Sequence, residues 1–235
     1  MGNTMIFGKI SAQIYVIKAN LAFQKGNSQD VLELLGKAYK TGSAKASVVS
    51  TYGYMLLKHG RLEEAMSIFT EQFNSTKLSA TEKFDVQSNY ALALWKKGQI
   101  DEAISLLEKV IASYKNTNIY GSLGYLYNLN GNLDKALKFN LEAYDYNNTN
   151  GIILDNLGET YFLLNDLENA DKVFKKLMAL NPKFPEAFYD YALVLKKMGD
   201  KEKCIEYLNK AMQFKPNYLS AITAEDIENM LKEME

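Results

Sequence analysis

The residues that most often carry out catalysis are scarce in this 235-residue chain. Its only histidine, His59, precedes Gly60 at the expected end of a helix, where the helix dipole favours a polar or cationic side chain. Its only cysteine, Cys204, lies within an apolar helical pattern, so neither an internal disulfide nor a cysteine zinc cluster can form. We therefore expect packing roles for both residues and no metal site.

Sequence motifs for nucleotide or acyl chemistry are also missing. The chain has no phosphate-binding loop, no dinucleotide fingerprint and no nucleophile elbow. Acidic residues are spread along helix surfaces, and several, such as Glu63 and Glu64, fall in first helical turns, where a carboxylate interacts favourably with the dipole. The sequence thus predicts a protein that is not an enzyme and needs no cofactor.

The composition is typical of an ordered protein and gives no sign of nucleic-acid binding. Hydrophobic residues make up 47% of the chain and charged residues 23%, and the formal net charge is -1. The N-terminal half is net basic and the C-terminal half is net acidic. No stretch reaches the ~18–20 uncharged apolar residues of a membrane span, and the N-terminus has no secretory pattern. We expect a cytoplasmic protein that binds neither nucleic acid nor membrane.

Regularly spaced turn residues divide the chain into similar repeats. Each of six residues, 33–38 positions apart, ends one apolar helical pattern and precedes another. Glycine adopts the left-handed conformation of a helix end without strain, and asparagine is the next best choice. The six residues are Gly26, Gly60, Gly98, Gly131, Asn165 and Gly199. The pattern predicts helix–turn–helix repeats and an all-α fold.

Small residues recur at matched positions on the two sides of each turn, always 12 positions apart. Five of the six pairs combine two small residues, which lets antiparallel helices approach closely. Large apolar residues, including most of the tyrosines and phenylalanines, flank them, so these aromatic side chains are expected in the core rather than stacked on bases. The pairs are Ala19–Val31, Gly53–Ala65, Ala91–Ala103, Gly124–Ala136, Gly158–Ala170 and Ala192–Cys204.

The repeat resembles the tetratricopeptide repeat along nearly the whole chain. Its clearest copy carries Leu157, Gly158, Tyr161, Ala170, Phe174 and Pro182. One departure is Asn140, which stands where the repeat has an aromatic residue. The resemblance implies a right-handed α-solenoid in a single domain, residues 1–235. We place the repeats at about 12–45, 46–79, 84–116, 117–150, 151–184 and 185–218, with a capping helix at about 223–235.

The resemblance also implies that the first helix of each repeat lines a concave groove that binds a peptide or protein segment. Asn89 and Asn156 resemble groove asparagines that bond a peptide backbone, since an amide both donates and accepts. Trp95 and Phe162 would add apolar pockets. The candidate groove residues are Asn20, Tyr54, Asn89, Trp95, Tyr125, Asp155, Asn156, Glu159, Phe162, Glu186, Tyr189 and Asp190.

The charge of the candidate groove separates this chain from one subtype. Tetratricopeptide proteins that hold the acidic C-terminus of chaperones use a clamp of basic residues, and that clamp is missing here. The groove instead ends in acids, at Asp155, Glu159, Glu186 and Asp190. Such an end would repel a carboxylate and prefer a basic or neutral segment. The alternative is that these acids only keep the surface soluble.

Two further functions stay open. The N-terminal stretch is apolar and could pack as a preceding half-turn, form a homodimer contact, or continue a longer protein; its apolar residues are Met5, Ile6, Phe7, Ile10, Ile14 and Ile17. A self-associating assembly subunit is therefore one alternative to peptide capture. The other is a regulatory peptide sensor, by resemblance to bacterial signalling receptors that contain such repeats.

Overall fold

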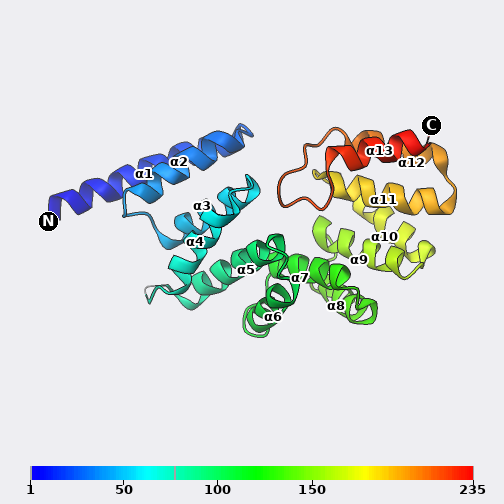
Figure 1. The fold of residues 1–235 in the computed structure, drawn as a ribbon, viewed down its shortest axis with the longest axis horizontal. Helices are drawn as coiled ribbons and strands as arrows, with labels where there is room; N and C mark the ends of the chain where they lie inside the picture. Colours follow the sequence, from blue (N-terminus) through cyan, green and yellow to red (C-terminus); the bar gives the residue numbers. More distant parts are fainter. Residues whose placement is uncertain (1, 77, 235) are drawn as a thin grey trace. The chain divides into compact units, whose positions relative to one another are not determined.

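The computed structural model describes residues 2–76 and 78–234, with only the backbone of residues 2–5. Every regular element in these ranges is an α-helix, so the all-α prediction is confirmed (Figure 1). Met1, Lys77 and Glu235 lie outside the described residues. None of the described helices is long and apolar enough to cross a membrane. The helices are α1 (Gly2–Gln24), α2 (Ser28–Lys40), α3 (Ala46–Lys58), α4 (Leu62–Phe73), α5 (Ala80–Lys96), α6 (Ile100–Ile111), α7 (Thr117–Asn130), α8 (Leu133–Tyr146), α9 (Gly151–Leu163), α10 (Leu167–Ala179), α11 (Pro185–Met198), α12 (Lys201–Ala211) and α13 (Ala224–Met234).

The helices form two compact bodies, the N-terminal body (residues 1–99) and the C-terminal body (residues 100–235). Within each body, consecutive helices pack against one another in chain order. Helices two positions apart also touch, as α3 touches α5, and α9 touches both α7 and α11. The first helices of these successive repeats are therefore neighbours within a body. That the two bodies act as a single domain stays a prediction from the sequence.

The six predicted turn residues all adopt the left-handed backbone conformation. Their φ angles run from 62° at Asn165 to 86° at Gly98. A polar side chain right after a turn then caps the next helix in several repeats, as when Asp166 accepts a hydrogen bond from the backbone N–H of Asn169. Ser79 and Glu82 form a capping box at the start of α5. The turns and caps together fix where each helix hairpin begins and ends.

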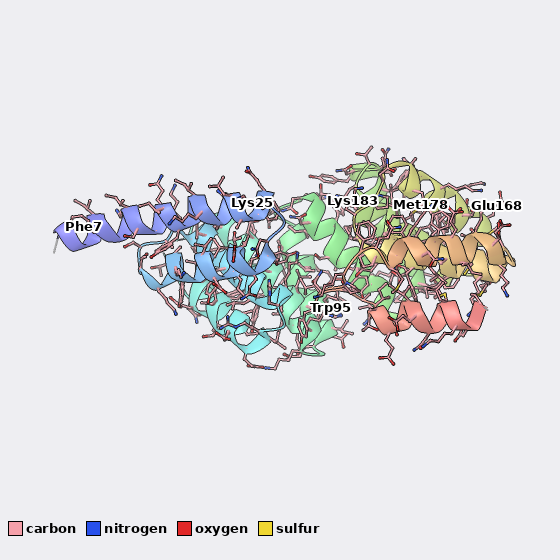
Figure 2. All side chains as sticks on the ribbon, turned by 90° about the horizontal axis from the view of Figure 1, so that it is seen from above. Phe7, Lys25, Trp95, Glu168, Met178 and Lys183 are labelled. Carbon is pink, nitrogen blue, oxygen red and sulfur yellow. The ribbon has the colours of Figure 1, made fainter. Side chains whose placement is uncertain are left out.

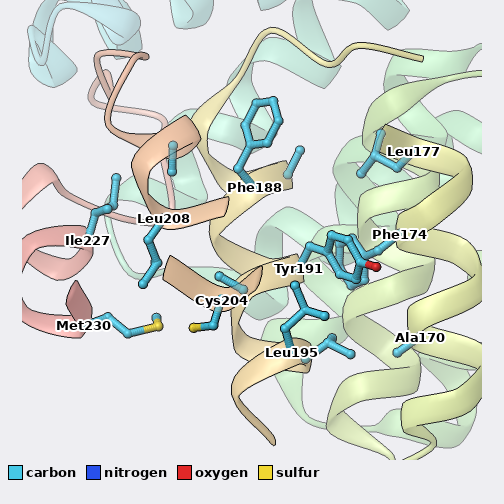
Figure 3. Packing of buried hydrophobic residues seen from close by; sticks show 14 of the residues in the cluster. Ala170, Phe174, Leu177, Phe188, Tyr191, Leu195, Cys204, Leu208, Ile227 and Met230 are labelled. Carbon is cyan, nitrogen blue, oxygen red and sulfur yellow. The ribbon is translucent and has the colours of Figure 1, made fainter. Parts of the chain in front are cut away.

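The small residues allow aromatic rings to lie directly on the facing helix. A Cβ atom at Gly158 would stand 2.6 Å from Phe174 Cε2, and a Cβ atom at Gly53 would stand equally close to Phe69 Cε1. The partner residues across the turn, such as Ala170, are fully buried. Phe174 in turn stacks on Tyr191 of the next repeat, with ring centroids 5.5 Å apart (Figure 3).

The predicted capping helix corresponds to α13, which covers the end of the C-terminal body. Ile227 and Met230 of α13 lie over Leu208 and Cys204 of α12 (Figure 3). The Cys204 side chain is fully buried, and burial raises the pKa of its thiol. Its burial agrees with the packing role expected for Cys204, which stands at the small-residue position of the sixth repeat. The helix start is capped by Thr223, whose hydroxyl accepts from the N–H of Asp226.

At the other end of the chain, α1 packs on α2 through small residues and leaves its opposite face uncovered. Ala12, Ala19 and Ala22 are buried, whereas Phe7, near the helix N-terminus, is 68% exposed (Figure 2). The side chain of Met5, part of the predicted apolar stretch, lies outside the described residues. The apolar stretch thus extends the first helix of the first repeat and does not fold back as a separate half-turn.

Because Gly158 admits the Phe174 ring, we expect Gly158→Leu to overpack the α9–α10 pair. The free energy of unfolding should fall by at least about 1–3 kcal/mol. Chemical denaturation followed by circular dichroism measures this loss. The matched control is Ala179→Leu, which enlarges an exposed residue of α10 and should leave stability nearly unchanged. Equal stability of both variants would show that the helix register described here is wrong.

Candidate binding groove

The candidate groove of the C-terminal body is built on α7, α9 and α11. Asp155 and Glu159 are four residues apart and so share one face of α9. Glu186 and Asp190 are related in the same way on α11. Because α9 touches both neighbouring first helices, these two acidic faces come together, and Tyr125 of α7 joins them. We call these four acids the carboxylate cluster.

Asp155 is the most buried member of the cluster. Its side chain is 8% exposed, and its Oδ1 atom has no hydrogen-bond partner. Burial raises the pKa of this carboxyl well above its usual range, and the negative charges of Asp190, Glu159 and Glu186 raise it further. A buried acceptor without a partner is uncommon in folded proteins, and its lost hydration destabilises the free state.

Two other members, Asp190 and Glu159, are partly buried and also have raised pKa values. Burial is the main cause of the raised pKa of Asp190, followed by the charges of Glu159 and Glu186. Burial also raises the pKa of Glu159, against a hydrogen bond from Asn128 that lowers it. The pKa of the Tyr125 phenol is raised by burial and then by all four carboxylates. The Tyr125 hydroxyl and the cluster therefore occupy one common region.

Among the described residues, no basic side chain neutralises this region. Ion pairs of the C-terminal body use acids outside the cluster, such as Glu108 with Lys135 and Asp171 with Lys175. The Glu186 carboxylate accepts a backbone hydrogen bond, from the N–H of Ala221 at 3.3 Å. The cluster thus concentrates negative charge in a partly desolvated place, where electrostatic interactions are stronger than in water.

A network of buried hydrogen-bonded side chains contacts the carboxylate of Glu159. Asn128 Nδ2 donates to Glu159 Oε2 at 2.9 Å, and Asn128 Oδ1 accepts from the hydroxyl of Thr160 at 2.7 Å. Asn140 joins them, since its Nδ2 lies 2.9 Å from Thr160 Oγ1. Sequence reasoning missed Asn128 and Thr160. The signal that could have revealed them is Asn140, because a polar residue at an aromatic position requires polar partners.

Asn156 occupies a different place from the one expected of a peptide-binding residue. Its side chain is 2% exposed, and Nδ2 donates to the backbone oxygen of Gly121 at 2.7 Å. Its amide therefore links α9 to α7 in the free protein. Tyr189 borders the cluster, and the pKa of its phenol is raised by burial and by nearby Asp226, Asp190 and Glu233. Phe162 lies further along α9, and the centroid of its ring is 5.2 Å from Lys197 Nζ.

The candidates of the N-terminal body are more scattered. Asn89 of α5 is half-buried and donates to Ser50 Oγ of α3 at 3.1 Å. Tyr54 is half-buried, and burial raises the pKa of its phenol. Trp95 is labelled in Figure 2. The centroid of its ring lies 4.1 Å from Lys96 Nζ. Asn20 is exposed on α1, and no described hydrogen bond or ring contact joins it to the other candidates. The structure therefore brings candidates together mainly in the C-terminal body.

Comparison with solved structures gives similar folds at low sequence identity. A thermophilic TPR protein of Thermus thermophilus is 18% identical, with a TM-score of 0.66 over 81% of this chain and 98% of its own. PilF of Pseudomonas aeruginosa is 12% identical, with a TM-score of 0.64 over 96% and 99% of the two chains. A tetratricopeptide repeat protein of Parabacteroides merdae is 14% identical, with a TM-score of 0.51 over 95% and 98%. These likenesses support the fold alone.

Family models give the sequence-level result. No curated protein matches the chain in sequence. Models described as the tetratricopeptide repeat match residues 90–150, 153–184 and 185–218, which together exceed half of the chain. The last two ranges nearly coincide with the predicted repeats at 151–184 and 185–218. With the helix hairpins, the left-handed turns and the small-residue pairs, these matches show that the chain belongs to the tetratricopeptide repeat family.

Proposed function

We propose that this protein captures a peptide or protein segment on the face formed by α7, α9 and α11, without catalysis. The tetratricopeptide fold is generally a protein-interaction or scaffold fold. The observation that carries the proposal is the carboxylate cluster, whose buried Asp155 oxygen has no partner in the free chain. A polar group held in this state stabilises a complex when a ligand supplies the missing contact.

The arrangement of the helices sets the mode of binding. Neighbouring first helices present side chains from successive repeats to one ligand, so an extended or helical segment can lie across several of them. Tyr125 and Tyr189 add aromatic surface beside the carboxylates, and aromatic residues often dominate binding energy at protein interfaces. A cytoplasmic location and a role in peptide sensing stay predictions from the sequence.

A second candidate function, self-association, is favoured by the exposed face of α1. Five of its exposed apolar residues follow alternating spacings of three and four, which is the spacing of a coiled-coil seam. The residues are Phe7, Ile10, Ile14, Ile17 and Leu21, each about half exposed or more. Beside the seam stand mostly uncharged residues such as Ser11 and Gln13, which would not repel a second copy. Pairing of α1 with α1 of another chain would cover the stripe.

To test peptide capture, a random 12-residue phage library would be selected on the immobilised protein, and the enriched peptides measured by fluorescence anisotropy. We expect Tyr125→Ala to weaken their binding by about tenfold, as loss of a buried aromatic contact does. The matched control is Tyr146→Ala on α8, which should bind normally. Failure to enrich any peptide over an unrelated bait, or equal loss in both variants, would refute the proposal.

To test self-association, light scattering would measure the mass of the protein across a range of concentrations. We expect a dimer that the double variant Ile10→Lys/Ile14→Lys converts to a monomer, since charges in a coiled-coil seam are strongly unfavourable. The control Thr51→Lys/Thr70→Lys adds the same charge to exposed positions of α3 and α4, away from the seam, and should remain dimeric. A wild-type protein that stays monomeric throughout would contradict this second function.

A further inference from the structure

We infer that the carboxylate cluster binds one basic side chain, a lysine or an arginine, of the captured segment. The inference rests on the proposed function, since it names the part of the segment that the face recognises. The expected ligand is a cation because the four carboxylates of the cluster all lie near Tyr125. Among the described residues, none of these carboxylates has a basic partner.

The unpartnered oxygen of Asp155 is the second observation. This side chain is more than nine-tenths buried, and its Oδ1 is the acceptor left without a hydrogen bond. The charges that act on it come from the other three members, on α9 itself and on the neighbouring helix α11, so it lies in the same region as they do. A buried acceptor surrounded by negative charge is best satisfied by a donor that is itself positively charged. An ammonium or guanidinium group fulfils both requirements.

The placement of the acids favours such a group over a metal ion. In the part of the chain that the structure describes, no three histidine, cysteine, aspartate or glutamate side chains are placed to hold a metal. Metal ions require oxygen ligands converging within about 2.0–2.6 Å, whereas a guanidinium spreads five N–H donors over a wider fork. Carboxylates on two adjacent helices can meet different edges of that fork.

Two neighbours orient the acids and two border the region. Asn128 holds Glu159 through a 2.9 Å hydrogen bond, and the backbone N–H of Ala221 holds Glu186. These contacts make Asn128 a positioning residue for the carboxylate. The phenol of Tyr125 lies within the field of all four acids, and Tyr189 borders Asp190. Aromatic rings beside a cation site accommodate the aliphatic stem of lysine or arginine and attract its charge.

Binding of a cation must be coupled to protons, because Asp155, Glu159 and Asp190 hold protons more tightly than ordinary carboxyls do. A bound positive charge favours the ionised forms, so binding releases protons and strengthens as the pH rises through the raised pKa values. The titratable groups that face the region are Tyr125 of α7, Asp155 and Glu159 of α9, Glu186, Tyr189 and Asp190 of α11, and, beside Tyr189, Asp226 and Glu233 of α13.

The same cluster should make the free protein less stable at higher pH. Carboxyls whose pKa is raised on folding stabilise the fold fully below their ordinary pKa, which is 3.8 for aspartate, and lose this contribution as the pH rises through the raised value. We expect the double variant Asp155→Asn/Asp190→Asn to melt at a higher temperature than the wild type at pH 8, and the difference to shrink towards pH 4. A difference in melting temperature that is independent of pH would contradict this.

The decisive experiment compares peptides selected on the wild type with their binding to charge-neutralised variants. Peptides enriched from the random 12-residue library should share a lysine or arginine at one position. Asp155→Asn/Asp190→Asn should weaken their binding at least about tenfold, as loss of a buried charge partner does. The control Asp134→Asn/Glu202→Gln removes the same net charge from exposed positions of α8 and α12 and should change affinity less than about twofold.

Calorimetry in buffers of different ionisation enthalpy measures the number of protons released on binding, which non-specific attraction would not change. The wild type should release protons on binding the selected peptide, and Asp155→Asn/Asp190→Asn should release fewer. If enriched peptides lack a shared basic residue, or if both double variants bind alike, the inference is wrong while peptide capture stands. If no peptide is enriched at all, peptide capture itself fails and the inference falls with it.

Discussion

The close approach of paired helices at glycine and alanine positions is the constraint on which the rest of this structure depends. At Gly158 the ring of Phe174 lies 2.6 Å from the position that a Cβ atom would take, and the same fit joins Gly53 to Phe69. Interiors packed at this density gain dispersion energy from many short contacts and tolerate little added volume. Each helix hairpin is therefore held at a fixed separation, and the next hairpin must pack on the surface that this separation creates.

The proposed binding face is a consequence of that packing. Since each hairpin packs on the next, first helices such as α7, α9 and α11 become neighbours, and faces that are far apart in sequence merge. Acids four residues apart on two such helices then form a group that neither helix has alone. Within the C-terminal body the fold thus converts a simple helical spacing into a local concentration of charge. The aromatic and apolar residues that face the other way supply the core that keeps the helices in place.

The fourth repeat shows how the packing rule is adapted near the candidate site. In the repeats with Gly53 and Gly158 the facing residue is a phenylalanine, but opposite Gly124 it is Asn140, whose amide oxygen lies against the glycine. The smaller polar side chain connects to Thr160 and, through Asn128, to Glu159. A hydrophobic contact has been exchanged for a network that ends at a carboxylate of the cluster. The exchange thus puts hydrogen-bonded polar side chains in the core, in contact with a carboxylate of the proposed binding face.

Most of the fold could be predicted from the sequence because its signals are local. A turn residue such as Asn165 and the small residues 12 positions apart act within one hairpin, so spacing alone reveals them. The acids of the cluster were also identified, since the family resemblance assigns their helix face. What the sequence could not show depends on contacts between hairpins. The burial of Asn156 against Gly121 and the link from Asn128 to Glu159 join residues 35 and 31 positions apart.

The carboxylate cluster has an electrostatic cost that the hydrophobic packing of the C-terminal body must offset. The acids around the buried Asp155 oxygen oppose folding at neutral pH, because Asp155, Glu159 and Asp190 lose hydration and negative charges lie near one another. Hydrophobic packing around α11, where Phe174 and Tyr191 stack and α13 covers the end, offsets this cost. A surface that only needed to be soluble would carry its acids exposed and paired, as Glu168 is with Lys172. Acids that are partly buried and uncompensated are more readily understood as a preorganised site, whose unfavourable electrostatics are relieved when a positive charge arrives.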